Sequence, residues 1–247
     1  MSTLAEEQDV RPTVNVRGQL ICLWMTPVVG AVLVIAFLAF PGFFPPMSPR
    51  MTADQVAGFY AHNTTMIRFS MITYNLFGIM LIPLFALIVV QMKRMATPNQ
   101  VLAYCYLTAA VSGATLFALA DIFWLVAAYR PERNPQLIQL LNDLAWITFI
   151  APVGMLVVQN LCLAVAVYLD AQPRPIFPRW VGAFSLATAA AMTPAAGAAV
   201  FRSGPLAWDG VVSFWVRIGA FAVNVAVMFV VVRRAIKQQA DDGATAE

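Results

Sequence analysis

Charged residues are scarce in this sequence of 247 residues, of which they make up 11%, whereas hydrophobic residues make up 61%. Soluble domains carry about 25% charged residues, so this deficit argues against a soluble domain. The sequence also contains several apolar runs that are long enough to cross a bilayer as helices. The composition therefore predicts an integral membrane protein.

The sequence has few of the histidine, lysine and cysteine residues that metal sites, Schiff bases and disulfides require. His62 is the only histidine, which argues against haem-bearing bundles, di-iron oxygenases and zinc proteases, because those sites need several imidazoles or dense carboxylates. No lysine lies within an apolar run, which excludes a retinal Schiff base. Cys22, Cys105 and Cys162 show no CxxC spacing, so we expect free thiols. We therefore expect neither a metal ion nor another cofactor.

Six apolar stretches predict an all-α fold, a bundle of six transmembrane helices within residues 20–234. Prolines, glycines or charged residues separate the stretches, as is typical of helix ends. Pro152 is expected to bend the fourth helix near its middle. Polar segments, residues 1–19 and 235–247, precede and follow the bundle. The predicted spans are residues 20–40, 66–92, 101–129, 141–169, 180–201 and 211–232.

The segment after the first span, residues 41–65, is predicted to be a loop on the extracytoplasmic side. Its four prolines between residues 41 and 49 exclude a regular helix there. Thr52 and Gln55 have the spacing of a capping box, which predicts a short helix directly after the prolines. Because the segment also carries four aromatic residues, we expect it to lie along the membrane surface, over the outer end of the bundle.

The basic residues predict the orientation in the membrane. Nine of them lie on the side of the two termini and four on the other side, so the positive-inside rule places both termini in the cytoplasm of a cell with a bacterial-type inner membrane. The nine are Arg11, Arg17, Lys93, Arg94, Arg174, Arg179, Arg233, Arg234 and Lys237, and the four are Arg50, Arg130, Arg133 and Arg202. Since these residues are not massed on one element, we expect no nucleic-acid partner. Trp24 and Trp180 on one side, with Trp124 and Trp208 on the other, are expected to lie at the membrane interfaces.

Charged side chains inside the spans form the candidate site. Asp121 lies nine residues before Arg130, roughly 13 Å below the outer end of its helix. Arg217 lies about 10 Å below the same face, and Arg68 and Asp143 lie nearer the surface. A charged residue in a membrane span costs roughly 2.5–3.5 kcal/mol, so it usually faces a partner or a cavity. We therefore expect these two arginines and two aspartates to share the outer third of the bundle.

Neutral side chains extend this polar region. Asn75 follows Arg68 by seven residues, and Asn224 follows Arg217 by seven, so each asparagine shares a helix face with an arginine. Trp146 lies one turn after Asp143 and is expected to shield the apolar part of a bound molecule. The predicted ligand-binding residues are Arg68, Asn75, Asp121, Asp143, Trp146, Arg217 and Asn224.

Three functions fit this pattern. The first is binding or carrying a small hydrophobic or anionic amphipathic molecule, whose head group the arginines would hold bidentately while Asp121 balances their charge. The second is a metal-free enzyme that uses Asp121 or Asp143 as a general acid or base on a lipid-soluble substrate. A contact between Asp121 and an arginine would argue against that chemistry. The third is a structural or accessory subunit whose polar groups only hold the helices together.

The expected partners follow from the same reasoning. Membrane lipid surrounds the bundle, and the amphipathic molecule of the first hypothesis occupies its outer half. The fifth span contains many alanines between Ala187 and Ala199, and small residues allow helices to approach closely in lipid. We therefore expect that a second copy of the chain could pack against this span.

Overall fold

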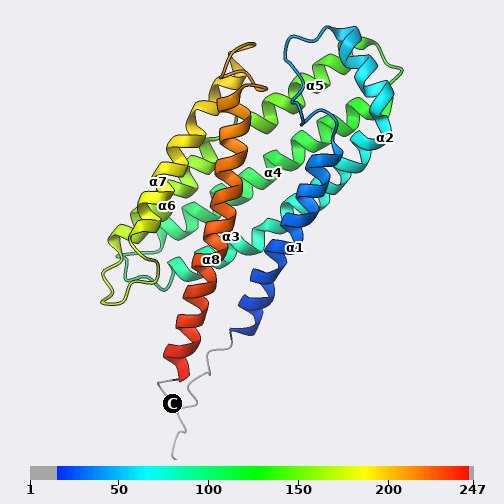
Figure 1. Cartoon of the computed structure of the whole chain (residues 1–247). Helices are drawn as coiled ribbons and strands as arrows, with labels where there is room; N and C mark the ends of the chain where they lie inside the picture. The colour runs from blue at the N-terminus through cyan, green and yellow to red at the C-terminus, as the bar shows by residue number, and fades with distance from the viewer. Residues whose placement is uncertain (1–15, 245–247) are drawn as a thin grey trace, which may run out of the picture.

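The structure is a computed structural model that describes residues 16–244, and its regular elements in that range are all helices. Within it, six helical stretches are long and apolar enough to cross a membrane, as expected for a multi-pass membrane protein. Figure 1 shows them side by side in one elongated bundle. The α-helices are α1 (Arg17–Ala39), α2 (Ala53–Gly78), α3 (Ile82–Met92), α4 (Val101–Tyr129), α5 (Pro135–Ile150), α6 (Gly154–Leu169), α7 (Trp180–Met192) and α8 (Arg217–Ala244), and the short helices are η1 (Ile79–Leu81), η2 (Thr193–Ala199) and η3 (Val211–Val216).

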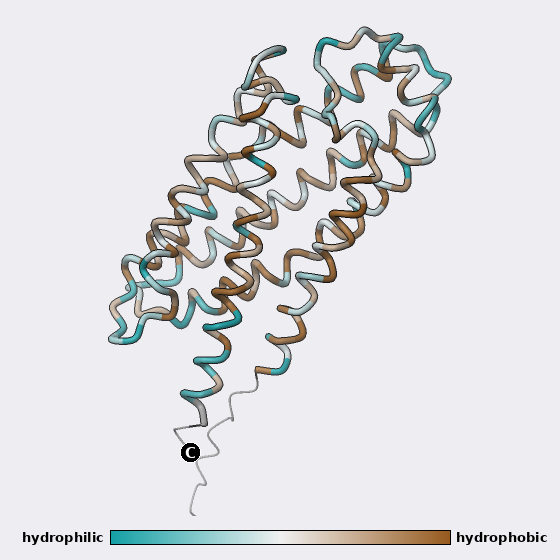
Figure 2. Tube along the Cα trace, viewed as in Figure 1, coloured by the Kyte–Doolittle hydropathy of each residue, from teal (hydrophilic) through white to brown (hydrophobic). Residues whose placement is uncertain are grey.

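The bundle has two distinct ends. The loop end carries residues 40–52, between α1 and α2, and residues 200–210, between η2 and η3. The base is the opposite end, where α1 begins and α8 ends (Figure 1). Figure 2 shows hydrophobic residues along the middle of the bundle and hydrophilic ones gathered toward both ends. This distribution is the one that a bilayer around the middle of the bundle requires.

The helix of the second predicted span begins at Ala53, well before residue 66, where the span was predicted to start. The predicted capping box is present: Thr52 N donates to Gln55 Oε1 at 2.9 Å, and Gln55 N donates to Thr52 Oγ1 at 3.3 Å. The helix that the capping box starts continues into the span. Residues 56–66 contain no proline, and the one glycine among them keeps its backbone N–H donor, so nothing interrupts the hydrogen bonds of the helix. One 3₁₀ turn, η1, interrupts the span just before Pro83, whose missing N–H cannot continue the α-helical pattern.

The fourth and sixth spans also differ from the predicted bounds. α5 begins at Pro135, where Asn134 caps the helix by accepting from Gln136 N at 2.9 Å, so the helix begins before residue 141, the predicted start of the span. The predicted break at Pro152 is confirmed, since α5 ends at Ile150 and α6 begins at Gly154. α8 continues to Ala244, beyond the predicted end at 232, so residues 235–244 of the predicted polar tail are helical. The remainder of the predicted polar ends, residues 1–15 and 245–247, lies outside the described residues.

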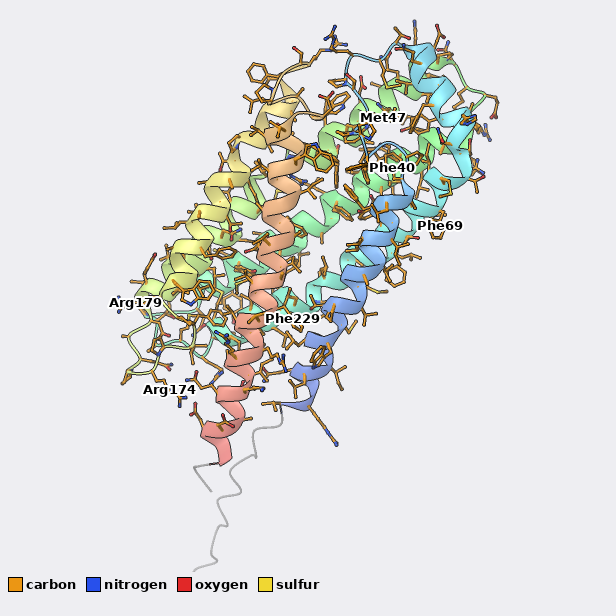
Figure 3. The ribbon with its side chains drawn as sticks, viewed as in Figure 1. Phe40, Met47, Phe69, Arg174, Arg179 and Phe229 are labelled. Carbon is orange, nitrogen blue, oxygen red and sulfur yellow. The ribbon has the colours of Figure 1, made fainter. Side chains whose placement is uncertain are left out.

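Residues 40–52, the first part of the segment that was predicted to lie along the membrane surface, lie partly inside the loop end of the bundle. Phe40, Phe43 and Met47 are buried, with 1%, 1% and 5% of their surface exposed, whereas Phe44 is 73% exposed. Figure 3 places Phe40 and Met47 among the ends of the helices. Trp208 Nε1 donates to Met47 O at 2.7 Å, which fastens the segment to residues 200–210. The segment is therefore inserted into the loop end of the bundle.

Asp209 adds a second attachment between the same two segments. Ser48 donates a hydrogen bond to its carboxylate, and the charge of Arg50 attracts it. Burial nevertheless raises the pKa of Asp209 above its ordinary value, because partial removal from water disfavours the charged form more than these contacts favour it. Residues 40–52 are thus held by polar contacts at their outer edge and by aromatic packing inside.

Candidate functional site

Phe43 lies at the centre of a group of aromatic rings at the loop end. Its ring centroid lies 5.6 Å from that of Trp124, 5.7 Å from Trp146 and 5.7 Å from Phe149. The Trp124 and Trp146 rings are 5.4 Å apart and nearly perpendicular, an arrangement that aromatic pairs favour. We call this group the aromatic cluster, and its members are Phe37, Phe40, Phe43, Trp124, Trp146, Phe149, Trp208 and Phe214.

Several buried polar atoms at this cluster have no hydrogen-bond partner among the described residues. Two are the indole Nε1 atoms of Trp124 and Trp146, whose side chains are fully buried. A third is Arg217 Nε, and a fourth is Asp121 Oδ2, on α4 next to Trp124. Asn224 Oδ1, seven residues beyond Arg217 on α8, also has no partner. Leaving such a group buried without a partner costs about 1–3 kcal/mol, more for a charged one. Native proteins contain few such atoms, and a concentration of them is a reason to look for a binding site.

Asp121 points into the bundle, as predicted, with 1% of its surface exposed. It lies on α4 between Phe117 and Trp124, and it is close enough to Tyr74 on α2 to interact with it electrostatically. Among the residues described, however, Asp121 forms no ion pair with an arginine. The predicted neutral cluster of arginine and aspartate is therefore not present as ion pairs.

Arg217 is the charged group that borders the aromatic cluster. It is the first residue of α8, directly after η3, and its guanidinium carbon lies 5.2 Å from the centroid of the Phe149 ring. Cation–π contacts of this kind stabilise a partly buried guanidinium. Phe149 in turn contacts Phe43 and Trp124, so Arg217 adjoins the same rings that surround the buried indole groups.

Arg68 lies apart from the aromatic cluster, so the structure does not bring it together with Arg217. Its side chain is exposed and donates to Ala128 O at 2.9 and 3.2 Å and to Tyr129 O at 3.0 Å. These carbonyls close the C-terminus of α4, where helices have unpaired acceptors that favour a positive charge. Ala128 follows Asp121 by seven residues, about 10 Å along the helix axis, which separates Arg68 from the buried carboxylate.

The remaining predicted residues divide into two groups. Trp146 belongs to the aromatic cluster, and Asn224 is buried on α8 with an unpartnered Oδ1. Asn75, in contrast, donates to Ala118 O on α4 at 3.1 Å and holds two helices together. Asp143 is half-buried beside Asn142, whose Oδ1 accepts from the Tyr60 hydroxyl at 3.0 Å. The structure thus places Trp146 and Arg217 at the cluster, with Asp121 next to Trp124 on α4.

Sequence reasoning missed Phe43 and Trp124, the two residues at the centre of the site. Trp124 was expected at the membrane interface together with Trp208, but both are buried, with 0% and 5% exposed. The signal for Phe43 was Gly42: a Cβ at that position would lie 2.8 Å from Phe40 Cε1 and 2.9 Å from Met47 Cγ. A side chain at this position would press on both neighbours, so a glycine among prolines and phenylalanines indicated a segment folded tightly on itself.

The arrangement brings unpartnered N–H donors next to an apolar surface. Trp124, Trp146 and Arg217 supply N–H donors, and the surrounding rings supply apolar surface. Within residues 16–244, no group of three or more histidine, cysteine, aspartate or glutamate side chains is placed to hold a metal ion. Comparison of the chain with protein-family models, curated proteins and solved structures gave no match.

Proposed function

We propose that this protein binds a small anionic amphipathic molecule at the loop end, with its head group near Arg217 and its apolar part against the aromatic cluster. The observation that supports this proposal is the set of three N–H groups, on Trp124, Trp146 and Arg217, that border one cluster without an acceptor. A carboxylate or phosphate offers several acceptor oxygens, and arginine binds such groups with charge-assisted hydrogen bonds.

Each part of the site has a role in this proposal. Arg217 attracts the anionic head group, and the two indoles add directed N–H donors. Phe43 and Phe149 pack against the apolar part, and residues 40–52 cover it from the loop end. Asp121, next to Trp124 on α4, has no arginine partner among the described residues, and its negative charge opposes the approach of an anion.

We further propose that the bundle lies in a bacterial-type inner membrane with its base in the cytoplasm. Among the described residues, lysine and arginine concentrate at the base, which is the cytoplasmic side under the positive-inside rule. The site at the loop end then faces the extracytoplasmic half of the membrane, where it receives molecules from the outer leaflet or from beyond it.

The proposal is tested by titrating palmitate into the full chain in a neutral detergent and measuring the heat of binding. We expect saturable binding at one site. Hexadecanol is the matched control, because it has the same chain but no carboxylate, and we expect it to bind at least tenfold more weakly. Equal binding of the two probes would contradict the role of Arg217, and absence of saturable binding of both would favour a structural or accessory subunit.

The second candidate function is a metal-free acid–base enzyme. The lack of an arginine partner at Asp121 within residues 16–244 favours it. A variant of Asp121 distinguishes the two functions. If the site binds anions, Asp121→Asn should tighten palmitate binding severalfold, because it removes a negative charge next to the cluster. The same titration measures this effect. If Asp121 instead serves as a general acid or base, the asparagine variant should leave palmitate binding unchanged and lose conversion of a lipid-soluble substrate.

A second copy of the chain is still proposed as a partner through the alanine-rich fifth span, but over a smaller surface. Ala189, Ala195 and Ala198 are buried within the chain, where they contact its other helices. Ala187 and Ala190 are exposed on α7, and they are the residues that a neighbouring helix could approach closely.

A further inference from the structure

A second polar site lies at the base of the bundle, at the opposite end from the aromatic cluster. A pocket of about 550 Å³ opens between the residues that follow α3, the residues that follow α6, and the end of α8. Its polar lining consists of Arg94, Gln172, Arg174, Gln238 and Asp242. The lining therefore combines two guanidinium groups, two side-chain amides and one carboxylate.

Residues 170–176 form one wall of the pocket. Asp170 holds this wall in place, and its side chain is buried, with 5% exposed. Its Oδ1 accepts from the backbone N–H of Ala96 at 3.0 Å and of Gln172 at 3.2 Å, and its Oδ2 accepts from Ile176 N at 3.1 Å. The Gln172 side chain also donates to Arg94 O. The pocket thus has a hydrogen-bonded frame that precedes any ligand.

Arg94 is positioned by the helices that pack beneath the pocket. Its Nη1 donates to Gln91 Oε1 at 2.5 Å and to Ala235 O at 3.2 Å. Both bonds use the same nitrogen, so the other N–H groups of the guanidinium can serve a ligand. Burial lowers the pKa of Arg94, and the charge of Asp242 opposes this shift. A bound anion would act in the same direction as Asp242 and stabilise the charged form.

Arg174 is the second cation, and its ion pair with Asp242 is exposed to solvent. Its Nη1 lies 3.4 Å from Asp242 Oδ1, and the two side chains are 74% and 52% exposed. Exposed ion pairs contribute little to stability, because water screens the charges and both side chains lose freedom. An anion with several oxygens that contacts Arg94 and Arg174 together can therefore displace Asp242.

The level of the pocket indicates the source of such an anion. α3 ends at Met92 and α6 at Leu169, so the pocket lies directly beyond the apolar length of two spans. Figure 3 places Arg174 and Arg179 at this end of the bundle. Trp180, which is 49% exposed, marks the same level as an interface. Lipid phosphates lie at that depth.

We propose that the pocket between Arg94 and Arg174 binds a phosphate group, supplied by the head group of an anionic lipid. Free phosphate offers the same oxygens, so the test must distinguish the two sources. The site is separate from the proposed anion site at the loop end, and the test uses neither palmitate nor Arg217. Its failure therefore leaves that function untouched.

The test is native mass spectrometry of the full chain released from neutral detergent, with phosphatidylglycerol and phosphatidylcholine as probes at equal concentration. We expect phosphatidylglycerol to be retained at least threefold more. Arg174→Gln should remove this preference, because it deletes one of the two guanidinium groups. Asp242→Asn should strengthen retention at least twofold, because it removes the competing carboxylate. Arg179→Gln is the matched control, since it deletes an exposed arginine outside the pocket, and it should change nothing.

The opposite signs of two variants make the result decisive. If Arg174 and Asp242 only pair with each other, both variants should act alike, and equal losses would overturn the proposal. An equal loss in Arg179→Gln would also overturn it, because it would show attraction by surface charge in general. Addition of 10 mM sodium phosphate distinguishes the sources: retained phosphatidylglycerol supports the lipid head group, whereas its displacement overturns that source and assigns the pocket to free phosphate.

Discussion

Replacement of Arg217 by glutamine is expected to weaken palmitate binding roughly 10- to 100-fold. A hydrogen bond to a charged group contributes about 1.5–3 kcal/mol, and each 1.4 kcal/mol corresponds to a tenfold change in affinity. Arg217 is the cation that borders the aromatic cluster, and its Nε has no partner that would compete with the ligand. Glutamine keeps N–H donors but loses the charge. Titration calorimetry of the two proteins in the same detergent measures the difference.

Arg68→Gln is the matched control for that change, because it removes the same charge from another arginine near the loop end. Arg68 donates to Ala128 O and Tyr129 O at the end of α4 and lies outside the cluster. We expect this variant to bind palmitate with unchanged affinity. Equal weakening by both substitutions would mean that the net charge of the loop end, and not a site at Arg217, attracts the anion.

Replacement of Phe43 by alanine is expected to destabilise the protein by about 3–5 kcal/mol, the usual cost of removing a buried phenylalanine ring. The ring contacts Trp124, Trp146 and Phe149, so its loss leaves a space lined by aromatic surface. If the apolar part of the ligand packs against this cluster, palmitate should fill part of that space. We therefore expect palmitate to raise the thermal midpoint of the variant more than that of the unchanged protein, as followed by near-ultraviolet circular dichroism.

Phe44→Ala supplies the control for this second change. Phe44 is the next residue in the same segment, but it is 73% exposed. Its replacement should lower the thermal midpoint only slightly and leave the effect of palmitate unchanged. A large loss in Phe44→Ala, or the same palmitate effect in all three proteins, would show that Phe43 has no special place in the site.

The six spans could be predicted from the sequence because their signal is local. A helix that crosses lipid must satisfy its backbone internally and present apolar side chains, so each span is visible as a run of residues. The ends of the helices were harder to predict. Nothing in lipid thickness stops a helix at the membrane surface, and α2 and α8 continue well beyond the predicted ends at residues 66 and 232.

The site was predictable only in part, for a related reason. The inward direction of Asp121 followed from the small residues one and two turns before it, Ala118 and Ala114, which share its helix face. The hydrogen-bond partners of the arginines could not be predicted from the sequence. Arg68 donates to carbonyl groups at the end of α4 and not to a carboxylate, and no pattern in the sequence indicates which helix end lies beside it. The insertion of Phe43 depended on contacts with five other elements and was equally hidden.

The central claim is that an anionic amphiphile binds against Trp124 and Trp146. The most direct test is to measure tryptophan fluorescence while 9,10-dibromostearate is added. The bromine atoms of this fatty acid quench the fluorescence of a tryptophan that they contact. Two variants are compared in the same detergent. One has Trp24 and Trp180 replaced by phenylalanine, and the other has Trp124 and Trp146 replaced. The account predicts saturable quenching in the first variant, reversed by oleate, and markedly weaker quenching in the second. Quenching that rises without saturation, to the same extent in both variants, would contradict it.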